Sequence, residues 1–282
     1  MARLIIARET TGPYRVSDTA LAAMARPKRK RRNFYMFLCF ICATGLFVAA
    51  TANAEDKEPA PPRVAMCAPL AIPSGATTKV IVRGWMIDKA TAVRSSDERI
   101  KVKILSKGSA TIPNKQDAKQ IGDQQIELEV AVSDVAPREV MLTIVTPTGD
   151  SKPHALLIGG DFPIVLDKES NNGFRQAQPI QLPQIIDGQL HSDRNVDVFS
   201  FTVERSTKVV IEVFARRRGS GLDSILTLYD ARGSVVAVND DHTETTDSRI
   251  EQTVPQGRYF IGLQDAHDHG GPTHPYRLIV RR

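Results

Sequence analysis

The sequence lacks the local signatures of the common catalytic and nucleotide-binding sites. It contains no G-x-S-x-G nucleophile elbow, no H-E-x-x-H zinc motif, no P-loop and no glycine-rich dinucleotide turn after a strand-like segment. The run GSG at 219–221 has the wrong spacing and follows three arginines, so we interpret it as a turn. These absences lower the expectation of catalysis, although aspartates and histidines far apart in the sequence could still assemble a site.

Cysteine is also scarce, with three residues in the whole chain. Cys39 and Cys42 lie in an N-terminal apolar run that we expect to be removed, which leaves Cys67 alone. No internal disulfide is then possible, so core packing or a bound metal must stabilise the mature chain. A single thiol without a Cys/His signature around it is more often a small buried hydrophobe than a nucleophile.

Excess positive charge is confined to the N-terminus. The formal charge of +5 comes from 37 basic and 32 acidic side chains, but the first 54 residues hold nine of the basic ones and only two of the acidic ones. The remainder therefore has 37 − 9 = 28 basic and 32 − 2 = 30 acidic side chains, a charge of −2. This balance gives no reason to expect a nucleic-acid partner.

The N-terminal segment has the pattern of a secretory signal peptide over residues 1–54. A basic block (26–33) precedes an apolar run (34–50), and small residues then lead to Ala54, after which we expect cleavage. Met24 is a possible true start. The alternative is a retained anchor, but the apolar run is short of the ~20 residues that span a bilayer. We expect a secreted, periplasmic or cell-envelope protein without a membrane span after cleavage.

Alternation of apolar and polar residues dominates the chain after a proline-rich tether at 55–63. A period of two indicates half-buried strands, and short strands at regular spacing predict an immunoglobulin-like β-sandwich over 64–163. The alternating segments of this part are 77–85, 100–105, 124–132, 138–146 and 154–159.

A polar stretch at 161–179 interrupts the alternation, and a second set of strands follows. Eight strands in roughly a hundred residues are typical of a jelly-roll-like double sheet, which we assign to 164–282. The sequence therefore predicts an all-β chain of two β-sandwich domains. The strands expected in the second domain are 185–190, 196–203, 208–215, 224–230, 234–239, 249–254, 258–265 and 276–280.

Several blocks of the second half are familiar in their order: ESNNGFRQAQPI (169–180), VDVFSFTV (196–203) and DSRIEQTVPQGRYFIGLQD (247–265). With them, residues 169–282 resemble the bacterial pre-peptidase C-terminal (PPC) domain of secreted planctomycete-type proteins. Through SGATTKVIVRGW (74–85), the first half is similar, more weakly, to IPT/TIG immunoglobulin-like domains. Both resemblances imply non-catalytic β-sandwiches on exported proteins.

The PPC resemblance also implies a calcium site. In collagenase-associated relatives, an entrance segment of Glu-x-Asn-Asn/Asp type and later aspartates bind calcium, and Ca²⁺ prefers such oxygen ligands. Asn172 stands where some relatives carry Asp, which removes a charge, and the alternative is that 171–173 form a polar turn. The matching positions here are Glu169, Asn171 and Asn172, with Asp193 and Asp197 as later candidates.

Other acidic residues and the histidines have weaker patterns. We expect Asp230 to form a turn, and the Asn-Asp-Asp run at 239–241, Asp247 and Asp265 to form turns rather than a second cation site. Imidazoles at the spacing of 267, 269 and 274, with His242 on a neighbouring loop, can bind zinc. However, the 265–274 segment is rich in glycine and proline, and the resemblance implies a conformational loop, so we do not expect zinc there.

These patterns favour an exported, non-enzymatic binding or accessory module with calcium as its expected ion. Its expected partners are other exported proteins or extracellular polysaccharide or protein polymers, bound through loops at the sandwich ends. Two alternatives remain open. One is a metal-dependent or Asp/His hydrolase that uses loops 239–247 and 265–274, and the other is a targeting or secretion appendage that acts with a protease.

Overall fold

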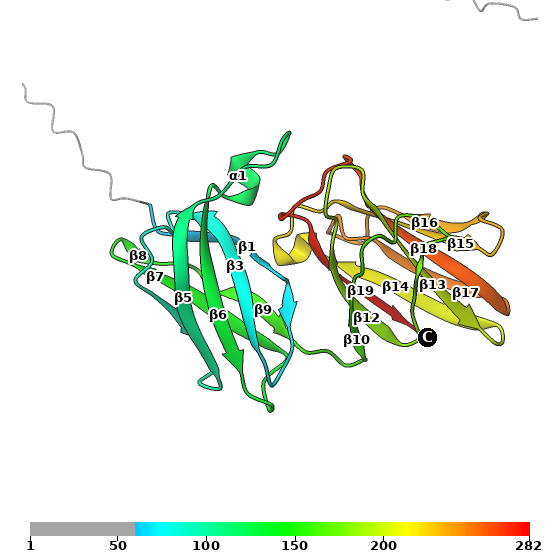
Figure 1. Cartoon of the computed structure of the whole chain (residues 1–282), viewed down its shortest axis with the longest axis horizontal. Helices are drawn as coiled ribbons and strands as arrows, with labels where there is room; N and C mark the ends of the chain where they lie inside the picture. The colour runs from blue at the N-terminus through cyan, green and yellow to red at the C-terminus, as the bar shows by residue number, and fades with distance from the viewer. Residues whose placement is uncertain (1–59) are drawn as a thin grey trace, which may run out of the picture. The chain divides into compact units, whose positions relative to one another are not determined.

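The computed structural model describes residues 60–282, so the predicted signal peptide and most of the tether lie outside the described residues. The described chain is all-β, as the alternation predicts (Figure 1). Its helical pieces are one turn of helix, α1 (Ala118–Ile121), and the 3₁₀ segment η1 (Arg216–Arg218). Among these residues, no helix has the length and hydropathy that a membrane span requires.

Two sheets with a common apolar core form the first part of the described chain. One has the order β1 (Arg63–Ala68), β3 (Thr77–Trp85), β6 (Gln124–Val132) and β5 (Ile100–Ser109), all antiparallel. The other has the order β2 (Ala71–Ile72), β9 (His154–Ile158), β7 (Glu139–Thr146) and β4 (Ala92–Ser95), and β8 (Gly149–Asp150) pairs with β7. The resemblance of this part to IPT/TIG domains stays a prediction.

The remaining cysteine belongs to this core. Cys67 on β1 is buried, and burial raises the pKa of its thiol to about 12. At neutral pH the group is therefore an uncharged thiol, which is unreactive as a nucleophile. Cys67 acts as a small hydrophobe, in agreement with the sequence-based interpretation.

Two further sheets enclose the second core. One has the order β10 (Ile164–Leu166), β12 (Gln184–Gln189), β19 (Pro275–Arg281), β14 (Thr207–Phe214) and β17 (Arg249–Val254). The other has the order β11 (Gln178–Pro179), β13 (Val196–Val203), β18 (Gly257–Asp265), β15 (Ser224–Asp230) and β16 (Val235–Asn239). Phe199 and Phe201 of β13 meet Ile211 and Val213 of β14 in one buried cluster.

The polar stretch between 161 and 179 contributes two strands to this sandwich. β10 pairs in parallel with β12, and β11 pairs in parallel with β13, so each is an edge strand of a different sheet. Residues 167–177 therefore pass from one sheet to the other at the same edge of the sandwich. This crossing carries most of the residues of the candidate site.

Candidate metal centre

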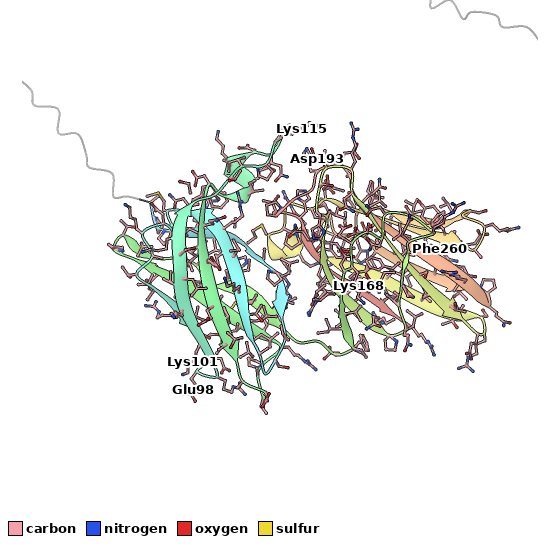
Figure 2. All side chains as sticks on the ribbon, in the orientation of Figure 1. Glu98, Lys101, Lys115, Lys168, Asp193 and Phe260 are labelled. Atoms are coloured by element: carbon pink, nitrogen blue, oxygen red, sulfur yellow. The ribbon has the colours of Figure 1, made fainter. Side chains whose placement is uncertain are left out.

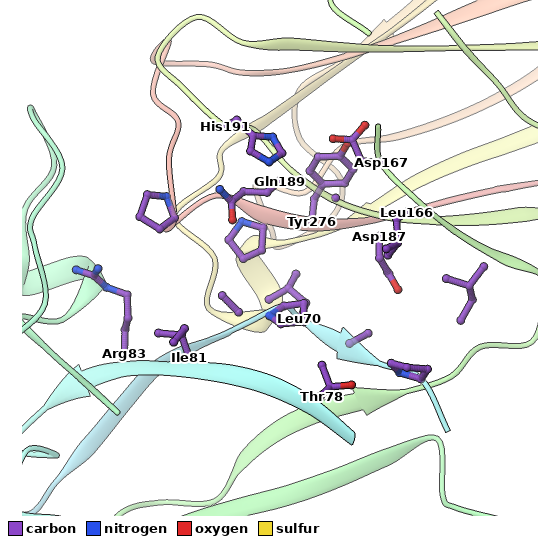
Figure 3. A pocket seen from close by; sticks show the side chains of 18 of the residues that line it. Leu70, Thr78, Ile81, Arg83, Leu166, Asp167, Asp187, Gln189, His191 and Tyr276 are labelled. Atoms are coloured by element: carbon purple, nitrogen blue, oxygen red, sulfur yellow. The ribbon is translucent and has the colours of Figure 1, made fainter. Parts of the chain in front are cut away.

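Three parts of the second sandwich bring polar side chains together at this edge. The crossing 167–177 supplies Asp167 and Asn171, β13 supplies Asp197, and β19 supplies Tyr276. Figure 3 shows Asp167 beside the ring of Tyr276, with His191 on the stretch of chain that follows β12. Strand pairing brings Asp167 and Tyr276 near each other. Asp167 directly follows β10 and Tyr276 lies on β19, and these two strands flank β12 in the same sheet.

Asp167, which is half-buried, and Asn171, which is buried, form a hydrogen-bonded pair with two buried oxygens that lack a donor. Asn171 donates from Nδ2 to Oδ1 of Asp167 at 2.8 Å, and its backbone oxygen accepts from the N–H of Val198 at 2.9 Å. Oδ2 of Asp167 and Oδ1 of Asn171 are buried and have no hydrogen-bond partner. Buried acceptors without a donor are costly, and a bound cation would satisfy both.

Asp197 is fully buried beside this pair. Its Oδ2 accepts from the Tyr276 hydroxyl at 2.6 Å, and its Oδ1 accepts from Nδ2 of Asn195 at 2.8 Å. Burial and the negative charges of Asp167 and Glu169 raise the pKa of Asp197 to about 8, although the hydrogen bonds from Tyr276 and Asn195 lower it. Without a cation, the Asp197 carboxyl is therefore mostly protonated at neutral pH.

Glu169 lies at the more exposed side of the same cluster. Its Oε1 is 2.7 Å from Nδ1 of His191, and both side chains are partly exposed. Candidate ligand atoms of Asp167, Glu169 and His191 lie within 4.8 Å of one another. The negative charge of Glu169 also contributes to the raised pKa of Asp167, whose largest cause is burial. The carboxylates are thus close enough to oppose one another's ionisation.

The predicted calcium ligands occupy different positions around this cluster. Glu169, Asn171 and Asp197 are part of it, and Oδ1 of Asn172 joins it indirectly by accepting from Nδ2 of Asn195 at 3.2 Å. Asp193 is exposed on the loop before β13 (Figure 2), and among the described residues no hydrogen bond joins its side chain to the others. Whether these five residues bind an ion stays a prediction.

The calcium site predicted from the sequence did not include Asp167, His191, Asn195 or Tyr276. A signal for Asp167 existed, because it stands two residues before Glu169 in the same polar stretch. No comparable signal marks Tyr276, which is 109 residues further along the chain than Asp167 and reaches the site only through sheet pairing.

We name Asp167, Glu169, Asn171 and Asp197 the acidic cluster. It offers three carboxylates and one amide oxygen, which are the donors that Ca²⁺ prefers. Asp197 lies on β13, whereas the other three residues lie on the crossing segment, which has no regular secondary structure. The residues present fit a hard divalent cation in chemistry.

Gly188 on β12 makes room for this arrangement. A Cβ atom at this position would lie 2.5 Å from Cζ and Oη of Tyr276 and 2.6 Å from Cβ of Asp167. We expect Gly188→Ala to lower the free energy of unfolding by about 1–3 kcal/mol, the usual cost of overpacking. The control is Gly108→Ala on β5, where no atom lies within 4 Å of the added methyl. Urea unfolding of both variants checks this, and equal losses would contradict it.

The acidic residues at other strand ends form turns and loops. Oδ1 of Asp230 accepts from the N–H groups of Arg232 and Ser234 at 2.8 and 2.9 Å, as expected for a turn. Asp247 accepts from the backbone N–H groups of three consecutive residues, 215–217, and from Nε of Arg217. Because these donors occupy its carboxylate, Asp247 is poorly suited to the catalytic role that the hydrolase alternative gave to its loop.

Part of the second sandwich is similar to a known family of domains. Residues 195–265 match the family model of the bacterial pre-peptidase C-terminal domain. A probable subtilase-type serine protease of Deinococcus radiodurans is 34% identical over 103 residues, which are 35% of this chain and 14% of that protein. The match thus spans a small fraction of the protease's length, and it transfers no catalytic activity to this chain.

Two solved structures illustrate the likeness in fold. The pre-peptidase C-terminal domain of a collagenase from Bacillus anthracis is 20% identical, with 37% of this chain and 94% of that chain covered and a TM-score of 0.32. The SGBP-B protein of Bacteroides ovatus is 8% identical, with 74% and 71% covered and a TM-score of 0.23. Because both scores are below 0.5, neither carries an argument here. Over residues 195–265, the second sandwich is thus similar to the bacterial pre-peptidase C-terminal domain.

Proposed function

We propose that this chain is an exported, non-catalytic accessory protein whose C-terminal sandwich is stabilised by calcium bound at the acidic cluster. One observation carries the calcium part of the proposal. Two buried acceptor oxygens, on Asp167 and Asn171, have no donor and lie beside a fully buried carboxyl, that of Asp197. A divalent cation would satisfy the two oxygens and favour the ionised form of Asp197.

Calcium is the ion that this donor set favours. All four members of the acidic cluster present oxygen atoms, and Ca²⁺ accepts six to eight of these at about 2.3–2.6 Å in flexible geometry. Mg²⁺ requires a near-ideal octahedron at shorter distances, which a crossing segment without regular structure supplies less readily. The carboxylate of Asp167 offers the charge that Asn172 lacks relative to some PPC relatives.

A bound ion would link the edge of the sandwich to its interior. The crossing segment joins β10 in one sheet to β11 in the other, and Asp197 lies on β13 next to β11. Calcium held between them would fix the crossing and keep the two sheet edges together. The end loops would then be presented on a rigid scaffold to exported proteins or extracellular polymers, the partners that we propose.

Thermal unfolding of the full chain tests the calcium proposal. An ion that binds only the folded state raises its stability by RT ln(1 + [Ca²⁺]/Kd), which is about 2.7 kcal/mol at 100 times Kd. We expect the midpoint of the C-terminal transition to rise with free Ca²⁺ and to fall with chelator. The variant Asp167→Asn should lose most of this response because it removes a charged ligand.

The matched control is Glu204→Gln, which removes an exposed acidic charge of the same sandwich outside the acidic cluster. It should keep the full calcium response. An unchanged midpoint of the wild-type protein in calcium and in chelator would refute calcium binding, while the assignment to an accessory domain would stand on the family match alone.

A further inference from the structure

A second group of ligand-type side chains lies in the same sandwich, away from the acidic cluster. Asp265 ends β18, and His269 and His274 lie in the loop that leads from β18 to β19. One ligand atom of each residue lies within 4.8 Å of those of the other two. Asp265 and His274 are 3% and 1% exposed, and His269 is partly exposed.

The imidazole of His274 has a nitrogen without a partner. Its Nδ1 lies 3.0 Å from the hydroxyl of Thr273, while its buried Nε2 has no hydrogen bond and is 3.6 Å from Oδ2 of Asp265. That separation is too long for a hydrogen bond. It is close to the spacing of roughly 3.3 Å between adjacent ligands of a tetrahedral zinc with bonds of about 2.0–2.1 Å.

Asp265 is oriented by its own hydrogen bonds. Its Oδ1 accepts from the backbone N–H groups of His267 and His269 at 2.9 Å each, and its Oδ2 accepts from that of Asp223 at 3.0 Å. These hydrogen bonds hold the carboxylate in one orientation, as supporting hydrogen bonds do for metal ligands.

The glycines of the loop give it a defined shape. A Cβ at Gly270 would lie 2.1 Å from the backbone oxygen of Ser192, so only glycine permits this approach. Gly271 has a φ of +98°, and its N–H donates to the oxygen of Leu190 at 2.8 Å. Gly270 and Gly271 thus hold the loop against residues 190–192, which fixes the path of the chain just before His274.

We propose that Asp265, His269 and His274 bind a transition-metal ion, zinc being the ion expected. Two imidazoles and one carboxylate are a donor set of zinc, whereas calcium favours oxygen alone. Three protein ligands leave the fourth position free for water.

Calorimetric titration of the untagged full chain with ZnCl₂ tests this site. Calcium is kept in excess so that it, and not zinc, occupies the acidic cluster. The zinc titration then tests the second site independently of the calcium proposal. We expect one zinc ion per chain with micromolar or tighter affinity. His274→Gln and His269→Ala should each weaken binding by ~10-fold or more, since each removes a ligand. His242→Ala, outside the group, should leave the affinity unchanged.

The partly exposed His269 keeps the test decisive if the buried His274 variant does not fold. Circular dichroism shows which variants retain the sheet structure. If the pair of His274 and Asp265 is only an imidazolium–carboxylate contact, the wild-type chain takes up no stoichiometric zinc. That result, or equal zinc affinity of wild type and folded His269→Ala, overturns the proposal.

Discussion

In the presence of chelator, the free energy of unfolding should fall as the pH rises from about 4 to about 8. The carboxyl of Asp197 causes this decrease, because burial and the nearby negative charges raise its pKa from 3.8 to about 8 in the folded chain. Between these two values the folded state holds a proton that the unfolded state has released. Stability is thus fully present below pH 4 and is lost at up to about 1.4 kcal/mol per pH unit until the folded group ionises.

The variant Asp197→Asn isolates this effect. Asparagine resembles the protonated acid in shape but does not titrate, so its stability profile in chelator should be flatter over the same range. Asp265 and Asp97 have pKa values of about 2, so the stability that they contribute is lost only below about pH 4, outside this window. Asp167 and Asp223 have raised pKa values and add a decrease of the same sign in both proteins.

Urea unfolding at a series of pH values, with the C-terminal transition followed by circular dichroism, measures both profiles. The quantity to compare is the difference between wild type and Asp197→Asn at each pH. Saturating calcium should also flatten the wild-type profile, because a bound cation lowers the pKa of Asp197. Parallel profiles of wild type and variant would contradict the assigned pKa.

Replacement of Asp247 by alanine should cause the largest loss of stability among the single substitutions considered. Asp247 is fully buried, and its carboxylate accepts from the N–H groups of Ala215, Arg216 and Arg217 at 3.1, 2.6 and 3.2 Å. It also pairs with Nε of Arg217 at 2.6 Å. Together these bonds join the loop before β17 to the start of η1 after β14.

Alanine at this position leaves several donors without an acceptor. Each buried group that loses its partner costs about 1–3 kcal/mol, and breaking a buried charge pair costs about 3–5 kcal/mol. Arg217 is partly exposed and water can solvate it, so we expect a total loss of about 3 kcal/mol or more. Asp247→Asn keeps one acceptor oxygen and should lose less.

The matched control is Asp230→Ala, at a turn where two N–H groups lose a more exposed acceptor. Water replaces the carboxylate there, so a smaller loss is expected. Chemical denaturation of the three variants gives the order, with Asp247→Ala the least stable. A loss at Asp247 no greater than that at Asp230 would show that the buried network is not a major source of stability.

Strands with a buried and an exposed face could be predicted closely from the sequence. The segments expected at 77–85, 124–132 and 196–203 coincide with β3, β6 and β13. In each, alternate side chains enter a core, and the hydrophobic pattern records this directly. The short strands β4, β10 and β11 were missed because two to four residues carry no measurable period, and their pairing depends on the neighbouring strand.

Residues of the candidate sites could be predicted only where they are close together in the chain or match a motif of the family that the sequence resembles. Glu169 and Asn171 followed from the PPC-like entrance segment. Tyr276 could not, because its contact with Asp197 spans 79 residues and depends on which strands are neighbours. His274 was noticed among the histidines, but its unpartnered nitrogen facing Asp265 is visible only in the folded structure.

Calcium titration of the full chain by calorimetry at pH 7 tests the central claim most directly, because calcium bound by Asp197 would displace the proton that this carboxyl holds. If calcium binds there, one ion per chain should be taken up and close to one proton released from Asp197, seen as a binding enthalpy that varies with the ionisation heat of the buffer. Asp197→Asn should bind more weakly and release no proton. Calcium uptake without proton release, or no uptake at millimolar calcium, would contradict the account.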